Sequence, residues 1–91
     1  MLHLTNLQTK GYDELIEIDG EIVYQVFAIK KNNGIYTTYY YTVPKNKLDQ
    51  AEDYEIEELN EFNELELAIK HIQSKGANLS RFNIFKGNKP L

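Results

Sequence analysis

Carboxylates are the most concentrated chemical groups in this sequence. Residues 52–66 hold eight acidic side chains and no basic one, whereas residues 67–91 hold five bases and no acid. Runs of this kind are usually solvated surface, but an acidic run also suits a basic partner protein. A divalent-cation site is not expected, because the run lacks the Asp-x-Asp-x-Asp-Gly pattern of calcium-binding loops. The acids that we expect to contact a partner protein are Glu55, Glu57, Glu58 and Glu61.

Tyrosine is the second residue type whose abundance could serve binding. The chain has seven tyrosines, and each joins a large apolar ring to a hydroxyl that can stay hydrated, which suits a contact surface for proteins. Two other uses remain open: rings that only stabilise a half-exposed sheet through cross-strand pairs, and a stacking platform for single-stranded nucleic acid. We expect Tyr24, Tyr36 and Tyr40 to contact a protein. The nucleic-acid alternative would use Tyr36, Tyr40 and the cations of residues 81–89.

Residue types for catalysis or metal binding are scarce. The absence of cysteine excludes disulfides, thiolate metal sites and cysteine nucleophiles. The two histidines, His3 and His71, are too far apart in the sequence to indicate a shared metal site, and His71 fits a boundary position on a helix. No phosphate-binding loop, nucleophile elbow or dinucleotide fingerprint occurs. We therefore expect no enzyme activity, no cofactor and no bound metal.

Length and charge narrow the remaining classes of protein. With 91 residues, the chain is expected to form one small domain over residues 1–91, with residues 87–91 as a frayed tail. The net charge of −4 argues against a protein whose main ligand is a phosphate backbone. No apolar run is long enough for a membrane span or a secretion signal, so we expect a cytoplasmic location and no membrane partner.

Two turn signals predict a three-stranded meander near the start of the chain. An Asp-Gly pair at residues 19–20 and an Asn-Gly pair at residues 33–34 separate runs that are rich in β-branched and aromatic residues. Such pairs favour two-residue type I′ turns, because both central positions need a positive φ. The third run covers residues 35–43 and ends at Pro44, which cannot donate a ladder hydrogen bond.

The register between the second and third strands stays open at this level. A two-residue turn would pair Phe27 with Tyr40, whereas a three-residue loop would pair Phe27 with Tyr39. A shift of one residue moves every side chain of a strand to the other face of the sheet. The sequence therefore does not decide which tyrosines lie together.

The second half of the chain predicts a capped helix over residues 64–75. Asn63 followed by Glu66 has the spacing of a capping box, and Gly76 is suited to the position just after the last turn. An apolar stripe with helical spacing runs through the segment. Its members are Leu65, Ala68, Ile69 and Ile72.

Two further strands are expected on either side of this helix. Residues 54–58 alternate as a short strand would, although a helical pattern also fits part of the acidic run. A last strand is expected within residues 79–86, with Phe82 and Ile84 on one side.

These elements together predict an α+β fold. We expect an antiparallel sheet of about four strands, with the β-meander first and one long helix packed on one face, in the order β-β-β-(β)-α-β. One helix can cover only one face of such a sheet. The other face is then expected to leave tyrosines and aliphatic side chains available to a partner.

The leading functional expectation is a non-enzymatic protein-binding module that uses its acidic segment and its tyrosine-bearing face. A concrete version is a modulator or inhibitor that offers its acids to the basic groove of a nucleic-acid-handling protein, as DNA mimics do. In general form the chain resembles small accessory proteins of phages and mobile genetic elements, and its high content of Lys, Asn and Ile is typical of AT-rich bacterial or phage genomes. The alternatives are a single-stranded nucleic-acid-binding module and a structural homodimer.

Overall fold

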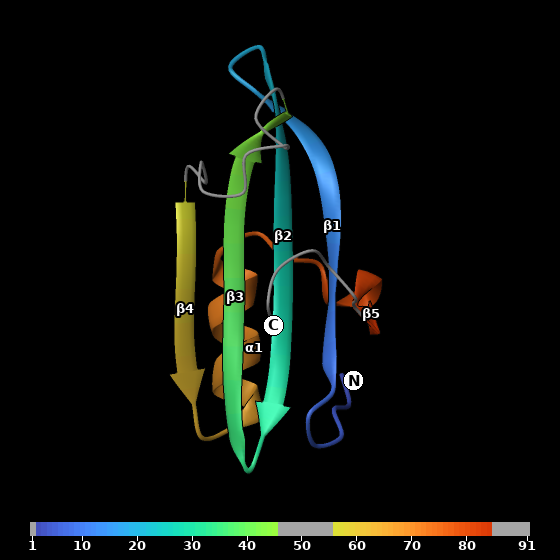
Figure 1. Ribbon diagram of the computed structural model, residues 1–91, viewed down its shortest axis with the longest axis vertical. Helices are drawn as coiled ribbons and strands as arrows, with labels where there is room; N and C mark the ends of the chain where they lie inside the picture. Colours follow the sequence, from blue (N-terminus) through green and yellow to red (C-terminus); the bar gives the residue numbers. More distant parts are fainter. Residues whose placement is uncertain (1, 46–55, 85–91) are drawn as a thin grey trace.

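A five-stranded antiparallel sheet with one α-helix on it forms the body of the protein, as the computed structural model of residues 2–45 and 56–84 describes it (Figure 1). The strand order across the sheet is β4-β3-β2-β1-β5. The predicted α+β class and the initial meander are confirmed, and the sheet has five strands rather than about four. The elements are β1 (Thr9–Ile18), β2 (Glu21–Asn32), β3 (Ile35–Pro44), β4 (Ile56–Phe62), α1 (Leu65–Ser74), a 3-10 turn (Leu79–Arg81) and β5 (Asn83–Ile84).

Both hairpins of the meander close through the predicted two-residue turns. The φ angles are +51° and +81° at Asp19 and Gly20, and +51° and +83° at Asn33 and Gly34. Positive φ at both central residues is the signature of the type I′ turn, whose twist matches that of the flanking strands. The second turn therefore pairs Phe27 with Tyr40, which decides the register that the sequence left open.

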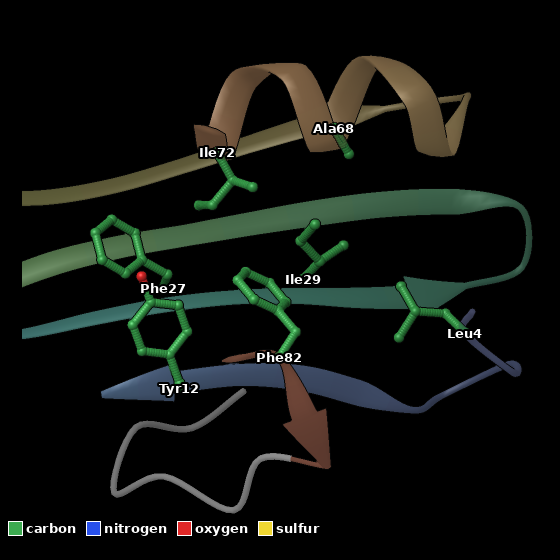
Figure 2. Packing of buried hydrophobic residues seen from close by; sticks show 7 residues of the cluster. All are labelled: Leu4, Tyr12, Phe27, Ile29, Ala68, Ile72 and Phe82. Atoms are coloured by element: carbon green, nitrogen blue, oxygen red, sulfur yellow. The ribbon is translucent and has the colours of Figure 1, made fainter. Parts of the chain in front are cut away.

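The main core lies between α1 and the face of the sheet that α1 covers (Figure 2). Ala68 and Ile72 point from the helix toward Phe27 and Ile29 on β2. The helical stripe predicted from the sequence is thus confirmed, since Leu65 and Ile69 also pack against this cluster. The buried members of the cluster are Leu4, Tyr12, Phe27, Ile29, Ala68, Ile72 and Phe82.

The opposite face of the sheet differs from the expectation of an open aromatic surface. Along its middle, Val26 and Ala28 on β2 and Tyr41 and Val43 on β3 are all buried. Apolar side chains that are exposed on this face lie toward its margins, such as Leu15 on β1 and Leu59 on β4. The expectation that one whole face is vacant is therefore wrong for the centre of the sheet.

The helix ends confirm one sequence signal and correct another. Gly76 has a φ of +102°, its N–H donates to the Gln73 carbonyl, and the Ala77 N–H donates to the Ile72 carbonyl. This pair of bonds is a Schellman motif, which the glycine allows without strain. At the other end the residue that caps α1 is Glu64, without a side-chain hydrogen bond. The predicted capping box, which begins at Asn63, is therefore not formed.

The last described segment contributes less strand than expected. Only Asn83 and Ile84 form β5, which pairs with Lys10 and Gly11 of β1. Phe82 is buried in the helix-side core. Ile84 pairs with Lys10, which lies opposite the core residue Ile29, so Ile84 is on the same side of the sheet as Phe82, as predicted, but it is 64% exposed. The predicted tail at residues 87–91 and the first part of the strand expected at 54–58 lie outside the described residues.

Within the described residues, α1 is the single α-helix, and no helix there is long and apolar enough to cross a membrane.

Candidate functional site

The candidate functional site is the outer edge of β4. β4 pairs with β3 on one side, and among residues 2–45 and 56–84 no backbone hydrogen bond reaches β4 from the other side. An edge strand presents a row of N–H and C=O groups that can pair with another chain.

The type I′ turn between β2 and β3 determines which β4 residues carry these outward groups. The pair Asn32–Ile35 closes the turn and is hydrogen-bonded, and hydrogen-bonded pairs then recur at every second residue. The neighbouring Lys31 accordingly bonds away from β3, donating to the Gln8 carbonyl at 3.2 Å and accepting from the Leu7 N–H at 2.6 Å.

The same alternation continues across β3 to β4. Tyr36 and Thr38 direct their backbone groups to β4, where their partners are Phe62 and Asn60. The intervening residues Leu59 and Glu61 therefore direct their N–H and C=O groups away from the sheet.

Three side chains surround this edge on the face opposite α1, and we call them the β4 edge surface: Tyr39, Leu59 and Glu61. Leu59 is 57% exposed and lies beside the half-buried Tyr39, its partner on β3. Burial raises the pKa of the Tyr39 hydroxyl above its ordinary value, and the negative charge of Glu61 raises that pKa further. The surface thus combines an exposed aliphatic side chain, a partly exposed ring and a carboxylate.

The other side of β4 is held to the helix by polar contacts. Glu58 forms an ion pair with Lys75, with 3.0 Å between the carboxylate oxygen and Nζ. Asn60 Nδ2 lies 3.0 Å from His71 Nε2, and the His71 ring lies 5.3 Å from the ring of Phe62. His71 therefore occupies the boundary position that its sequence context predicted, and Asn60 is a structural partner that the sequence did not reveal.

The four predicted acids do not act as one group. Strand geometry places Glu58 on the helix side, where Lys75 binds it, and Glu61 on the opposite side, where it is exposed. Glu57 pairs through its backbone with Tyr41, and Glu55 lies outside the described residues. A continuous acidic surface that includes both Glu58 and Glu61 is therefore excluded, because neighbouring strand residues point to opposite faces.

The three predicted tyrosines are also divided between the two faces. Tyr24 lies opposite α1 and donates a hydrogen bond of 2.5 Å to Asp13. Tyr36 and Tyr40 lie on the helix side, where Tyr40 stacks on Phe27 with 5.2 Å between ring centroids. A shared surface of these three rings required the three-residue loop, and the two-residue turn removes it.

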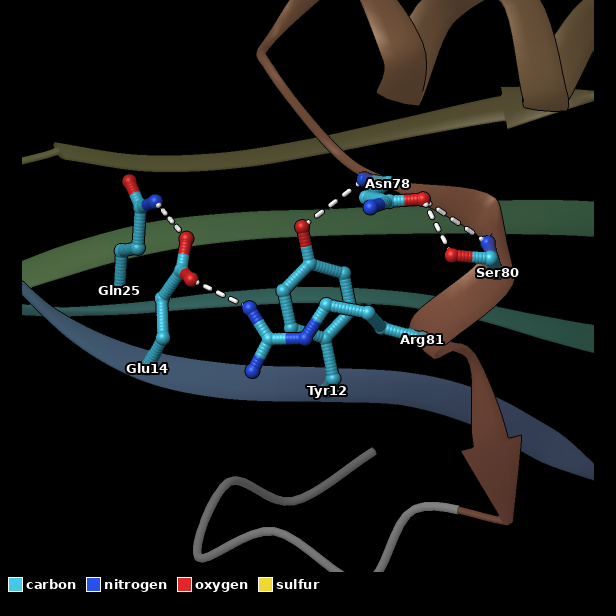
Figure 3. A network of polar contacts seen from close by, with 6 residues as sticks. All are labelled: Tyr12, Glu14, Gln25, Asn78, Ser80 and Arg81. Atoms are coloured by element: carbon cyan, nitrogen blue, oxygen red, sulfur yellow. Dashed lines mark hydrogen bonds and ion pairs between the residues drawn. The ribbon is translucent and has the colours of Figure 1, made fainter.

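Of the cations expected to serve nucleic-acid binding, Arg81 is already engaged within the fold, and Lys86 and Lys89 lie outside the described residues. Arg81 forms an ion pair of 2.5 Å with Glu14, and its guanidinium carbon lies 4.4 Å from the centroid of the Tyr12 ring (Figure 3). Glu14 also accepts a hydrogen bond of 2.6 Å from Gln25, and the Tyr12 hydroxyl accepts one of 2.8 Å from the Asn78 N–H. This network joins the segment after α1 to β1 and β2, so Arg81 serves the fold.

Gly11 is a residue whose importance the sequence did not reveal. A Cβ at this position would overlap the Phe27 carbonyl oxygen and lie 2.7 Å from the Ala28 Cα, so β1 approaches β2 too closely for any side chain. An isolated glycine inside a strand pattern is a known sign of close backbone approach. That signal was present, but the turn signals do not mark where the first strand begins, so Gly11 was not recognised as lying inside it.

The described part of the chain contains no group of three or more His, Asp or Glu residues that could hold a metal ion. Comparison with protein-family models, with curated proteins and with solved structures finds no match to this chain. Function is therefore inferred from the geometry of the chain alone.

Proposed function

We propose that the protein is a non-enzymatic protein-binding module and that its partner binds at the β4 edge surface. The observation that carries this proposal is the exposure of Leu59 on an edge strand whose outward backbone groups have no partner among the described residues. Leu59 is 57% exposed, so burying the rest of its side chain against a partner is favourable by about 1–2 kcal/mol. The backbone groups beside it supply directional hydrogen bonds to the same partner.

The competing explanation is that β4 carries acids only to prevent aggregation. Proteins do protect edge strands with charged residues, and Glu61 fits that purpose. Leu59 does not, because an exposed leucine two residues from Glu61 on the same face adds the apolar contact that the charge would discourage. A purely protective edge would place a lysine, a proline or another charge at this position.

A second copy of the same chain is a less suitable partner for this edge. Antiparallel pairing of two β4 strands centred on Leu59 would set position 61 of one chain opposite position 57 of the other, and both residues are glutamates. Like charges directly opposite each other destabilise a strand pair. The partner is therefore expected to be a different protein with basic residues at its contact surface.

The contact that we propose involves fewer carboxylates than a DNA mimic would present. Imitation of a phosphate backbone needs several carboxylates on one surface, and Glu58 and Glu61 lie on different faces of β4. The contact that we propose uses Glu61 together with Leu59 and Tyr39. An accessory protein that modulates a basic partner remains the functional class.

Site-specific photo-cross-linking tests the location. A photoreactive amino acid at position 59 is expected to capture a distinct protein in cells, whereas the same residue at position 67 on α1 is not, although Leu67 is also exposed at 45%. With the captured protein purified, Leu59→Ser should weaken binding about tenfold and the matched Leu67→Ser no more than about twofold. Equal capture at both positions, or equal loss of affinity in both variants, would contradict the proposal.

A further inference from the structure

We infer that the partner contributes a β-strand with alternating basic, apolar and basic side chains, which pairs antiparallel with β4 and extends the sheet. This inference rests on the proposed function and identifies the chemistry of the partner segment. Strand addition of this kind gains affinity from main-chain hydrogen bonds and specificity from alternate side chains.

The backbone of β4 determines the register of such a strand. Because Leu59 and Glu61 direct their N–H and C=O groups outward, each can form a hydrogen-bonded pair with one residue of an added antiparallel strand. The partner residues in those pairs lie directly opposite Leu59 and Glu61, with their side chains on the face away from α1. The residues between them point toward the helix side.

The side chains of the β4 edge surface then determine the pattern. Opposite Leu59, an aliphatic residue such as valine would cover the exposed apolar surface. Opposite Glu61, a lysine or arginine would neutralise a carboxylate whose charge already acts on Tyr39. The sequence again has glutamate at position 57, so the residue on the other side of the aliphatic one is also expected to be basic. The pattern is therefore basic-x-aliphatic-x-basic.

The described residues on the helix side of β4 do not occupy the edge at which the partner strand would pair. Glu58 is bound by Lys75 and Asn60 by His71, so those two residues hold β4 against α1 and leave its outer backbone free of α1. The edge is thus fixed in the extended conformation before a partner arrives. A preorganised edge avoids the entropic cost of ordering one of the two strands.

A short synthetic peptide tests the inference directly. The probe is acetyl-Thr-Lys-Thr-Val-Thr-Lys-Thr-amide, titrated into the ¹⁵N-labelled protein and followed by the amide signals of residues 56–62. We expect the largest shifts, and slower hydrogen exchange, at the amides of Leu59 and Glu61. Binding should weaken about threefold when NaCl rises from about 50 to 500 mM, because exposed charge pairs are screened.

Backbone methylation of the peptide separates strand addition from a simple charge contact. An N-methyl group on the valine removes the hydrogen bond to the Leu59 carbonyl and should abolish binding, whereas N-methyl groups on the two threonines beside the valine, whose N–H groups point away from β4, should leave it unchanged. Equal effects of the two methylations would overturn the inference, as would shifts that avoid Leu59 and Glu61.

Charge exchange supplies the matched protein variants. Glu61→Lys should bind the lysine peptide more weakly and prefer a peptide with glutamate in place of its first lysine, the one opposite position 61, whereas Glu66→Lys, an equal change of charge on exposed α1, should keep the original preference. An unchanged preference for the lysine peptide in Glu61→Lys would overturn the inference. Protection of Leu59 and Glu61 by self-association without peptide would also overturn it, because the occupant would then be a second copy.

Failure here is distinguishable from failure of the proposed function. If cross-linking at position 59 captures a specific partner whose linked segment lacks the basic-x-aliphatic-x-basic pattern, the binding function stands and strand addition is wrong. If position 59 captures nothing beyond what position 67 captures, the binding function itself is wrong.

Discussion

Replacing Gly11 with alanine is expected to be the most damaging single-methyl change in the described part of the chain. The φ of Gly11 is not in the positive region that favours glycine, so backbone conformation alone predicts a harmless substitution. The space around Gly11 predicts a damaging substitution, because the new Cβ would overlap the Phe27 carbonyl oxygen and lie 2.9 Å from the Ala28 Cβ. The obstructing atoms belong to the backbone of β2 or lie directly on it, so no rotation of a flexible side chain relieves the contact.

The size of the effect follows from the displacement that is needed. Separating β1 from β2 by about 1 Å stretches ladder bonds of about 2.9 Å beyond hydrogen-bonding range. Losing two such bonds at about 1 kcal/mol each, with about 1–3 kcal/mol for the overpacked site, gives about 3–5 kcal/mol. Gly11 also pairs with Asn83 of β5, so the short fifth strand should be lost as well. A domain of this size has about 5–13 kcal/mol in total.

Urea unfolding followed by far-UV circular dichroism measures this loss. With a denaturant dependence of about 1.5 kcal/mol/M, the Gly11→Ala midpoint should fall by about 2–3 M. Gly34→Ala is the matched control, because a Cβ there meets nothing within 4 Å and only the φ of +83° opposes it. That control should cost about 1 kcal/mol. If Gly11→Ala costs no more than Gly34→Ala, the reasoning from close strand approach is refuted.

Three further experiments test the packing of the core, the titration of Tyr39 and the hydrogen bond of Tyr12. Ile72→Ala leaves a cavity in the fully buried core under α1 and should cost about 2–5 kcal/mol by the same urea assay, and a cost below about 1 kcal/mol would contradict the packing described. The folded state raises the pKa of Tyr39, so the free energy of unfolding should be fully retained below the unfolded tyrosine pKa of about 10 and should fall as the pH rises through the higher folded pKa. Glu61→Gln should lower the folded pKa of Tyr39, which a ¹³C-tyrosine NMR titration would measure. Tyr12→Phe removes the acceptor of the Asn78 N–H and should cost about 1 kcal/mol, whereas an unchanged urea midpoint would mean that water replaces the hydroxyl.

Local signals in the sequence were sufficient to predict the meander and the helix. The Asp-Gly and Asn-Gly pairs carry their own conformational preference, and the stripe through Ala68 and Ile72 needs only helical periodicity. Asn63 and Glu66 have the spacing of a capping box, but the chain enters α1 from β4 with Glu64 at the N-cap position. Asn63 therefore does not cap the helix. Caps depend on the direction from which the chain arrives, and in this protein tertiary structure sets that direction.

The candidate site was harder to predict because it depends on pairing between distant segments. Glu61 was predicted as a contact residue and is exposed, but Leu59 was not singled out, since an isolated leucine in an acidic run suggests only weak amphipathicity. Its significance appears once β4 is known to be an edge strand, and strand order is not encoded in any local pattern. The division of Tyr24 from Tyr36 likewise depended on a single residue of turn length.

The alternation along β4 explains how one short strand can serve both the fold and a partner. Residues 58 and 60 face the helix and bind Lys75 and His71, and residues 59 and 61 lie on the other face with their backbone groups directed outward. The two-residue turn at Asn33 sets the face and the hydrogen-bonding side of every residue in β3, and the register of β4 on β3 carries this alternation over to β4. Inserting one residue into that turn would shift β3 against β2 by one position. It would therefore break the contacts between the sheet and α1 and also change which residues of β4 direct their backbone groups outward. The binding edge and the core thus depend on the same turn length.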